Sequence, residues 1–80
     1  MRSEYIRAEM QRLVRQVPFQ PFVITLENRQ RLTVDHPENL IFASRQDGQG
    51  GSDDFYVRDG SRILYSNFEA VTTIAFEEAG

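Results

Sequence analysis

His36 is the one histidine of the 80-residue chain, and its side chain is the group best suited to acid–base chemistry near neutral pH. Asp35 precedes it, but adjacent strand residues point to opposite faces, so the two are poorly placed as a catalytic pair. The chain has no cysteine, which excludes thiolate nucleophiles and zinc–thiolate sites. We therefore expect a non-catalytic protein in which His36 has a structural role at the end of a strand.

Residues 47–54, Asp-Gly-Gln-Gly-Gly-Ser-Asp-Asp, form a glycine-rich acidic segment. As a phosphate loop it lacks a lysine, and its carboxylates would repel the ligand. As a calcium loop it lacks the alternating oxygen ligands and the terminal glutamate. We expect a solvent-exposed loop over residues 45–54, and no metal or cofactor.

All nine basic residues are arginines. Residues 1–34 hold six of them against three glutamates, a net charge of +3, whereas residues 35–80 hold three against nine carboxylates, a net charge of −6. Helix arginines with two aromatic residues could bind single-stranded RNA, the alternative function: Arg2, Arg7, Arg12, Arg15, Phe19 and Tyr56. Glutamates on the same helix could instead pair with those arginines, so RNA is not the favoured partner.

An amphipathic helix is predicted over residues 3–17. Apolar residues recur there at the helical period: Ile6, Met10, Leu13, Val14 and Val17. Ser3 is a suitable N-cap, and Pro18 disfavours the helical conformation at the residue before it, so the helix should end there.

A β-hairpin is predicted within residues 18–37. Phe22, Ile24 and Leu26 share one face of its first strand, and Leu32 and Val34 continue that face in the second. Between the strands, Asn28 is the residue best suited to a left-handed conformation.

The remaining chain predicts short strands separated by turns. Residues 40–44 are a short extended segment, and a strand begins at Phe55. Asp59-Gly60 is a two-residue hairpin signal before a strand over 62–66. A turn at 67–70 precedes the last strand, 71–76, whose alternation places Val71, Thr73 and Ala75 on one face and Thr72, Ile74 and Phe76 on the other.

These elements predict one domain, residues 1–80, of mainly β (α+β) class: helix 3–17, then a strongly bent five-stranded antiparallel sheet over 21–76. The predicted core consists of Ile6, Met10, Leu13, Val17, Phe22, Ile24, Leu26, Leu32, Val34, Leu64 and Ile74. No apolar run approaches the ~20 residues of a membrane span, so we expect no membrane association and a cytoplasmic location.

The order helix, hairpin, hairpin, short turn, last strand is similar to that of the Sm/SH3-like small barrels, and Tyr65-Ser66-Asn67 resembles the matching turn of bacterial Sm-like RNA chaperones. Residues 16–26 and 34–38 also resemble a group of short bacterial proteins of unknown function. That group combines a Q-P-F-x-P-F motif with an I-x-L strand and V-x-H-P-E. The first resemblance implies a small barrel, and the second implies no activity.

The leading prediction is a binding or assembly module that recruits another protein or itself, as a homodimer or small ring. A chain this short gains stability from a core shared between subunits. The predicted self-association edge is the chargeless last strand, with Val71, Thr72, Thr73, Ile74 and Phe76. Lysine at Thr72 or Thr73 should therefore disrupt assembly or folding.

Overall fold

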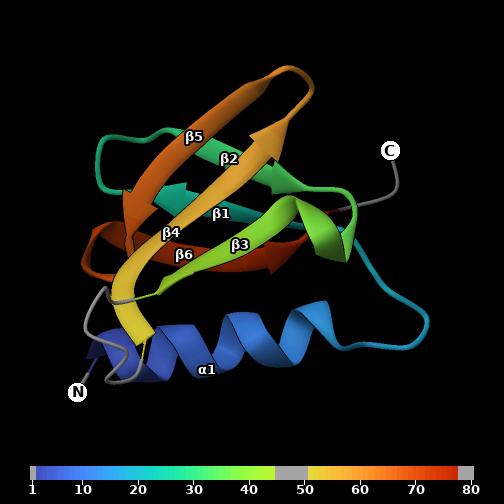
Figure 1. Ribbon diagram of the computed structural model, residues 1–80, viewed down its shortest axis with the longest axis horizontal. Helices are drawn as coiled ribbons and strands as arrows, with labels where there is room; N and C mark the ends of the chain where they lie inside the picture. The colour runs from blue at the N-terminus through green and yellow to red at the C-terminus, as the bar shows by residue number, and fades with distance from the viewer. Residues whose placement is uncertain (1, 45–50, 78–80) are drawn as a thin grey trace.

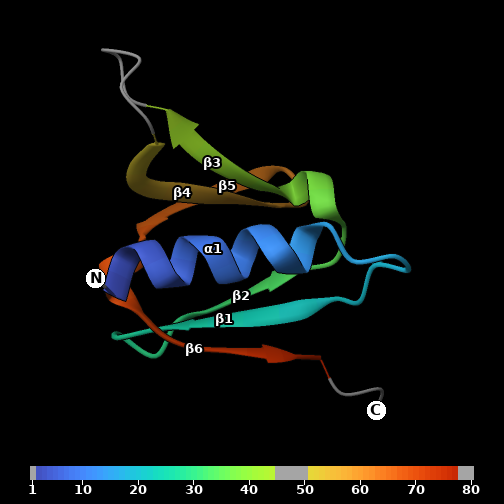
Figure 2. The same cartoon turned by 90° about the horizontal axis from the view of Figure 1, so that it is seen from below.

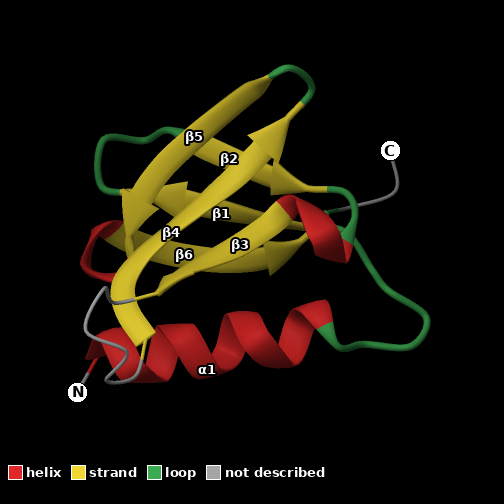
Figure 3. Cartoon of the chain, viewed as in Figure 1, coloured by secondary structure: helices red, strands yellow, loops and turns green. Residues whose placement is uncertain are grey.

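The computed structural model describes residues 2–44 and 51–77 (Figure 1). One α-helix, α1 (Arg2–Val14), precedes six strands: β1 (Phe22–Leu26), β2 (Arg31–Val34), β3 (Leu40–Ser44), β4 (Gly51–Asp59), β5 (Arg62–Asn67) and β6 (Val71–Phe76). Two 3₁₀ turns, η1 (Pro37–Asn39) and η2 (Phe68–Ala70), lead into β3 and β6. Figure 3 shows that the protein is mainly β, as predicted. Among the described residues, no helix is long and apolar enough to cross a membrane.

The strands form two three-stranded antiparallel sheets, in the orders β2-β1-β6 and β3-β4-β5, and not one sheet of five. The sixth strand is the extended segment 40–44, which pairs with β4. Proline has no N–H for a strand ladder, so Pro37 separates β2 from β3, and η1 takes the chain from one sheet to the other. Figure 1 shows α1 along one side of both sheets, and Figure 2, seen from below, shows it in front of the space between them.

The helix is shorter than predicted at its C-terminus. It ends at Val14, and i to i−3 hydrogen bonds from the N–H groups of Arg15 and Gln16 close its last turn. The Gln16 side chain also donates to the Leu13 carbonyl at 2.9 Å. Val17 therefore lies outside the helix and is 96% exposed, so its placement in the core was wrong. Ser3 was wrongly assigned as the N-cap, since it lies inside the helix and is buried.

The hairpin turns are present, but other residues shape them. In the β1–β2 turn the left-handed residue is Arg29, with φ 70°, because the Asn28 side chain accepts a hydrogen bond from the Gln30 N–H at 2.9 Å. Between β4 and β5, Asp59 still belongs to the strand, and the turn begins at Gly60, with φ 63°. The predicted loop 45–54 is also shorter, because residues 51–54 already form part of β4. Its first six residues lie outside the described part of the chain.

A β-bulge changes the inward face of β6. Thr25 pairs with Thr73 while Leu26 pairs with Val71, so Thr72 is an extra residue. Its hydroxyl donates to the Thr25 carbonyl at 3.0 Å. The extra residue places Val71 and Ile74 on the same inner side, where regular alternation would separate them. The predicted alternation is correct only beyond the bulge.

The core fills the space between the sheets. Seven of the predicted core residues are buried, namely Met10, Leu13, Phe22, Ile24, Leu26, Leu32 and Val34. Three more, Ile6, Leu64 and Ile74, are partly buried against them. The prediction missed Leu40, Phe55, Val57, Phe68 and Val71, which are buried too. Phe68 of η2 stacks on Phe55, with ring centroids 5.2 Å apart, so the turn before β6 contributes a central core side chain.

Candidate functional site

The residues suited to catalysis are not assembled into a site. His36 and Asp35 are both exposed, and β2 ends before them at Val34. The His36 side chain makes no capping hydrogen bond, while its carbonyl accepts from the Asn39 N–H at 3.0 Å at the start of η1. Within residues 2–44 and 51–77, no group of three or more histidine, aspartate or glutamate side chains could hold a metal ion.

The helix arginines are engaged in local contacts or exposed. The guanidinium carbon of Arg7 lies 5.4 Å from the centroid of the buried Phe68 ring, an ordinary cation–π geometry. Arg12 forms an ion pair with Glu9, and its Nε donates to that carboxylate at 3.3 Å. This hydrogen bond lowers the pKa of Glu9 and raises that of Arg12. Arg15 is exposed, and the side chain of Arg2 lies outside the described side chains.

The aromatic residues predicted to stack on bases lie on different elements. Phe19 lies between α1 and β1, where its ring packs against Phe22 with centroids 6.0 Å apart. Tyr56 is in the middle of β4 and pairs directly with Tyr65 of β5, with ring centroids 5.2 Å apart. Tyr56 is thus joined to another tyrosine and not to the helix arginines.

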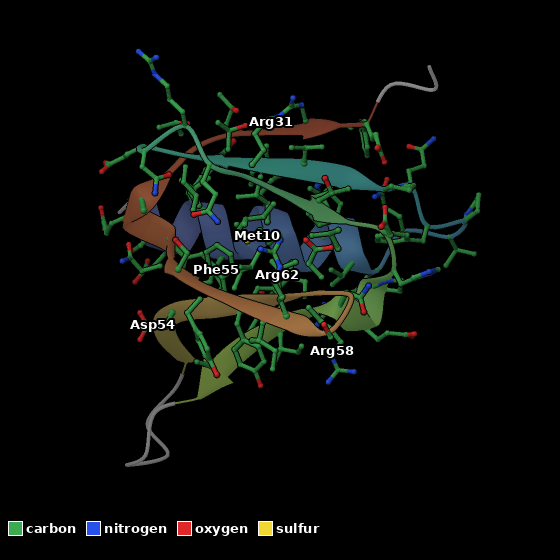
Figure 4. All side chains as sticks on the ribbon, turned by 90° about the horizontal axis from the view of Figure 1, so that it is seen from above. Met10, Arg31, Asp54, Phe55, Arg58 and Arg62 are labelled. Carbon is green, nitrogen blue, oxygen red and sulfur yellow. The ribbon has the colours of Figure 1, made fainter. Side chains whose placement is uncertain are left out.

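The outer face of β3-β4-β5 carries an exposed aromatic and aliphatic patch. Because Val57 and Phe55 point into the core, their neighbours in β4, Tyr56 and Arg58, point outward. The register adds Ile41, Ile63 and Tyr65 to this outer face. Ile63 is 45% exposed and Tyr65 74% exposed. In Figure 4, Arg58 lies on the opposite side of the molecule from Arg31, with Met10 and Phe55 between the sheets.

The outer face of β2-β1-β6 is instead hollowed. Cross-strand register aligns Arg31, Thr25 and Thr73 in one row, and Thr33, Val23 and Ala75 in the next. These six residues, together with Phe76 and Glu77, line an open hollow of about 740 Å³. Apart from Arg31, Phe76 and Glu77, the side chains that line this hollow are short, and that leaves the space above the sheet unfilled.

The free edge of β6 is the third candidate surface, and the sequence predicted its residues. β6 is the last strand in the order β2-β1-β6. Thr72, Thr73 and Phe76 are exposed, whereas Val71 is buried and Ile74 is partly buried. A smaller hollow separates this strand from Glu9, Arg12 and Leu13 of α1.

Sequence reasoning missed the tyrosine pair and the hollow, because both depend on which residues face each other across strands. The available signal was the alternation in Phe55-Tyr56-Val57 and in Phe22-Val23-Ile24, which places Tyr56 and Val23 outward. Comparisons with known proteins add no further assignment: no family model, curated protein or solved structure matches the chain. Function is therefore argued from the three surfaces.

Proposed function

We propose that this protein is a non-catalytic assembly module that accepts a strand from another chain, either a second copy or a different protein, at the free edge of β6. The observation that carries the proposal is the composition of this edge. Strand β6 contains no charged residue, no proline and no glycine. Such an edge is a template for another strand, because no strand lies beyond Ile74 and Phe76 in the sheet order to pair with their outward backbone groups.

The other edge strands are less suitable. β2 has four residues, including Arg31, and β5 begins with Arg62. β3 is also chargeless, and it carries a bulge as β6 does, but it is one residue shorter. A charge protects an edge, so β6, the longest chargeless edge strand in the described part of the chain, is the favoured edge.

The hydrogen-bonding pattern identifies the backbone groups that point outward. The Glu77 N–H donates to the Pro21 carbonyl at 3.1 Å, so Glu77 continues the ladder between β6 and β1. Since antiparallel ladders alternate, Thr73 and Ala75 also bond toward β1, while the N–H groups of Ile74 and Phe76 point to the free edge. Phe76 is 51% exposed, so a change there disturbs the core least.

The test is Phe76→Pro, which removes an outward N–H without removing a bond to β1. Phe76→Ala is the matched control, because it removes the same side chain and keeps the N–H. In light scattering over micromolar to millimolar concentrations, we expect the parent and Phe76→Ala to associate and Phe76→Pro to be monomeric. A parent protein that stays a soluble monomer at high micromolar concentration would refute self-association through this edge. Capture of a different chain is tested by the same two variants in a pull-down, where loss in both would contradict strand addition.

We also propose that the two sheets belong to one small Sm/SH3-like barrel. The shared core, the packing of β2 near β4 and the turn η2 between β5 and β6 support it. Continuous amide contacts around the sheets, measured by NMR in solution, would establish closure, whereas two separate sets of contacts would exclude it.

A second candidate function, binding of single-stranded RNA, is favoured by the Tyr56–Tyr65 pair. Aromatic rings on a sheet with an arginine beside them can stack on bases and contact phosphates, and Arg58 is on the same face. Fluorescence anisotropy with labelled single-stranded RNA tests it at low and moderate salt. We expect Tyr65→Ala to weaken binding because it removes a ring on which a base can stack. Arg58→Gln should weaken binding and make it less dependent on salt, since phosphate contacts release counterions. No binding of the parent at low salt would reject this candidate.

A further inference from the structure

The hollow on the outer face of β2-β1-β6 has an arginine among its lining residues. Arg31 begins β2, is exposed, and pairs with Thr25 of β1, which in turn pairs with Thr73 of β6. No ion pair between described residues involves Arg31. Its planar guanidinium group can donate two parallel hydrogen bonds to a carboxylate. This end of the hollow therefore offers a cation to an anionic ligand.

The other charges around this face limit the ligand to one negative charge. Exposed Glu27 and Arg29 lie in the β1–β2 turn beside Arg31, so that end has two positive charges against one negative. At the opposite end, exposed Asp35 follows β2 and exposed Glu77 follows β6, and both are negative. An anionic group is thus favoured at Arg31, whereas a second one reaching the far end would be repelled.

The floor of the hollow is apolar although it faces outward. Val23 is 7% exposed, and Ala75 is its partner in β6. Both lie two residues along their strands from Thr25 and Thr73, which places them about 7 Å from the row that contains the arginine. Phe76, which is 51% exposed, also lines the hollow. Apolar surface is therefore within reach of a chain or ring attached to a carboxylate.

We propose that this hollow binds an aliphatic or aromatic monocarboxylate. Its carboxylate accepts hydrogen bonds from Arg31, and the threonine hydroxyls of the same row can donate to the remaining oxygen lone pairs. Its apolar part covers Val23 and Ala75 and extends toward Phe76. The volume of about 740 Å³ is within the range of small-molecule sites. The site lies on the face of the sheet, so it does not depend on strand addition at the β6 edge.

The binding should be weak, because the hollow is open and one side of the ligand stays in water. For a ligand with the size of octanoate we expect a dissociation constant of about 0.1–5 mM. Arg31 is exposed, so added salt should weaken the binding further.

A comparison of four probes tests the proposal, with binding followed by amide chemical shifts in NMR at micromolar protein concentration. Octanoate should shift the amides of Thr25, Thr73 and Ala75 in a saturable way. Acetate lacks the apolar chain, and the second carboxylate of suberate would approach Glu77, so each should bind at least about fivefold more weakly. The uncharged vicinal octanediol should bind at least about threefold more weakly than octanoate, because it forms no ion pair with Arg31.

Variants separate the contribution of the arginine from that of the floor. Arg31→Gln should weaken octanoate binding at least about threefold and remove the advantage of octanoate over octanediol. Arg29→Gln is the matched control: it removes the same charge from the neighbouring turn, outside the hollow, and should change the affinity by less than about twofold. Ala75→Gln covers the floor at an exposed position and should weaken both octanoate and octanediol. The amide spectrum of each variant shows whether it remains folded.

Several results would overturn the proposal. The first is the absence of saturable shifts up to about 20 mM octanoate, well above the expected dissociation constant. The others are shifts centred on the outer face of β3-β4-β5, suberate or octanediol that binds as tightly as octanoate, and an Arg31→Gln protein that binds octanoate like the parent. Strand addition is tested separately by association of the Phe76→Pro and Phe76→Ala proteins. Either proposal can thus fail while the other holds.

Discussion

The sheets β2-β1-β6 and β3-β4-β5 are alike on the inside and differ on the outside. Both contribute aliphatic and phenylalanine side chains to one core. Outside, the first carries short threonine, valine and alanine side chains around a hollow, and the second carries Tyr56, Tyr65 and Ile63. Successive side chains of a strand point to opposite faces of the sheet. The inner residues are therefore constrained by the shared core, while the outer residues can vary independently.

That difference separates the residues that stabilise the fold from the surfaces on which our proposals rest. The inner faces are interchangeable in chemistry and account for stability. The first sheet has a hollow above short side chains, whereas the second exposes the Tyr65 ring. Variants of the interior should therefore affect both faces together, and variants of one face should leave the other unchanged.

The largest expected effect comes from removing a side chain that both sheets share. Phe68 is fully buried and packs against Phe55 and Phe42, with Arg7 over its ring. Phe68→Ala should lower the free energy of unfolding by about 3–5 kcal/mol, which is comparable to the whole stability of a small domain. Urea denaturation followed by circular dichroism measures the loss.

Tyr65→Ala is the control for that experiment, because Tyr65 is a comparably large aromatic side chain that is 74% exposed. Its loss should lower the free energy of unfolding by less than about 1 kcal/mol. Equal losses in the two variants would show that the outer face of β3-β4-β5 contributes to folding as much as the core does.

A medium effect should separate the two hairpins. Both turns contain a left-handed residue, Arg29 in the first sheet and Gly60 in the second. Gly60→Ala should lower stability by about 1 kcal/mol through backbone strain alone, since an added Cβ meets no atom within 4 Å. Arg29→Gly should raise stability by up to about 1 kcal/mol, because it relieves the strain that Gly60 avoids. Thermal unfolding of both variants, with Gly60→Asn as a tolerated substitution, checks the opposite signs.

Much of the interior could be predicted from the sequence. Phe22 and Ile24 point to the same face of β1 because strand residues alternate, and the helical spacing of Met10 and Leu13 marks the buried side of α1. The missed residues have physical reasons. Phe68 lies in a turn, where no period marks its direction, and its position depends on Asn67, whose side chain accepts from the Ala70 N–H at 3.0 Å. The inward direction of Val71 depends on the bulge at Thr72, which pattern alone does not show.

The candidate surfaces were predictable only in part for the same reason. The chargeless strand 71–76 can be read along the chain, and its bounds are confirmed. The tyrosine pair joins two strands, and the hollow is lined by residues far apart in sequence, such as Arg31 and Thr73. Their proximity depends on strand register, which is set by the turns and the bulge.

The smallest expected effect concerns α1, which lies along one side of both sheets and whose Glu9 and Arg12 flank β6. The hydrogen bond from Arg12 lowers the pKa of Glu9 from its ordinary value of 4.5 in the folded protein. A carboxyl group with a lowered pKa in the folded state stabilises the fold above its unfolded pKa, and this contribution disappears as pH falls through the folded value. Glu9→Gln should therefore be slightly less stable than the parent above about pH 5, and the two should converge near pH 2–3. Because the pair is exposed, the difference should be small and should shrink in added salt. Thermal midpoints measured from pH 2 to pH 8 check this, with Glu4→Gln on the same helix as the control. A difference that persists at pH 2 would mean that Glu9 acts through packing beside β6 and not through its charge.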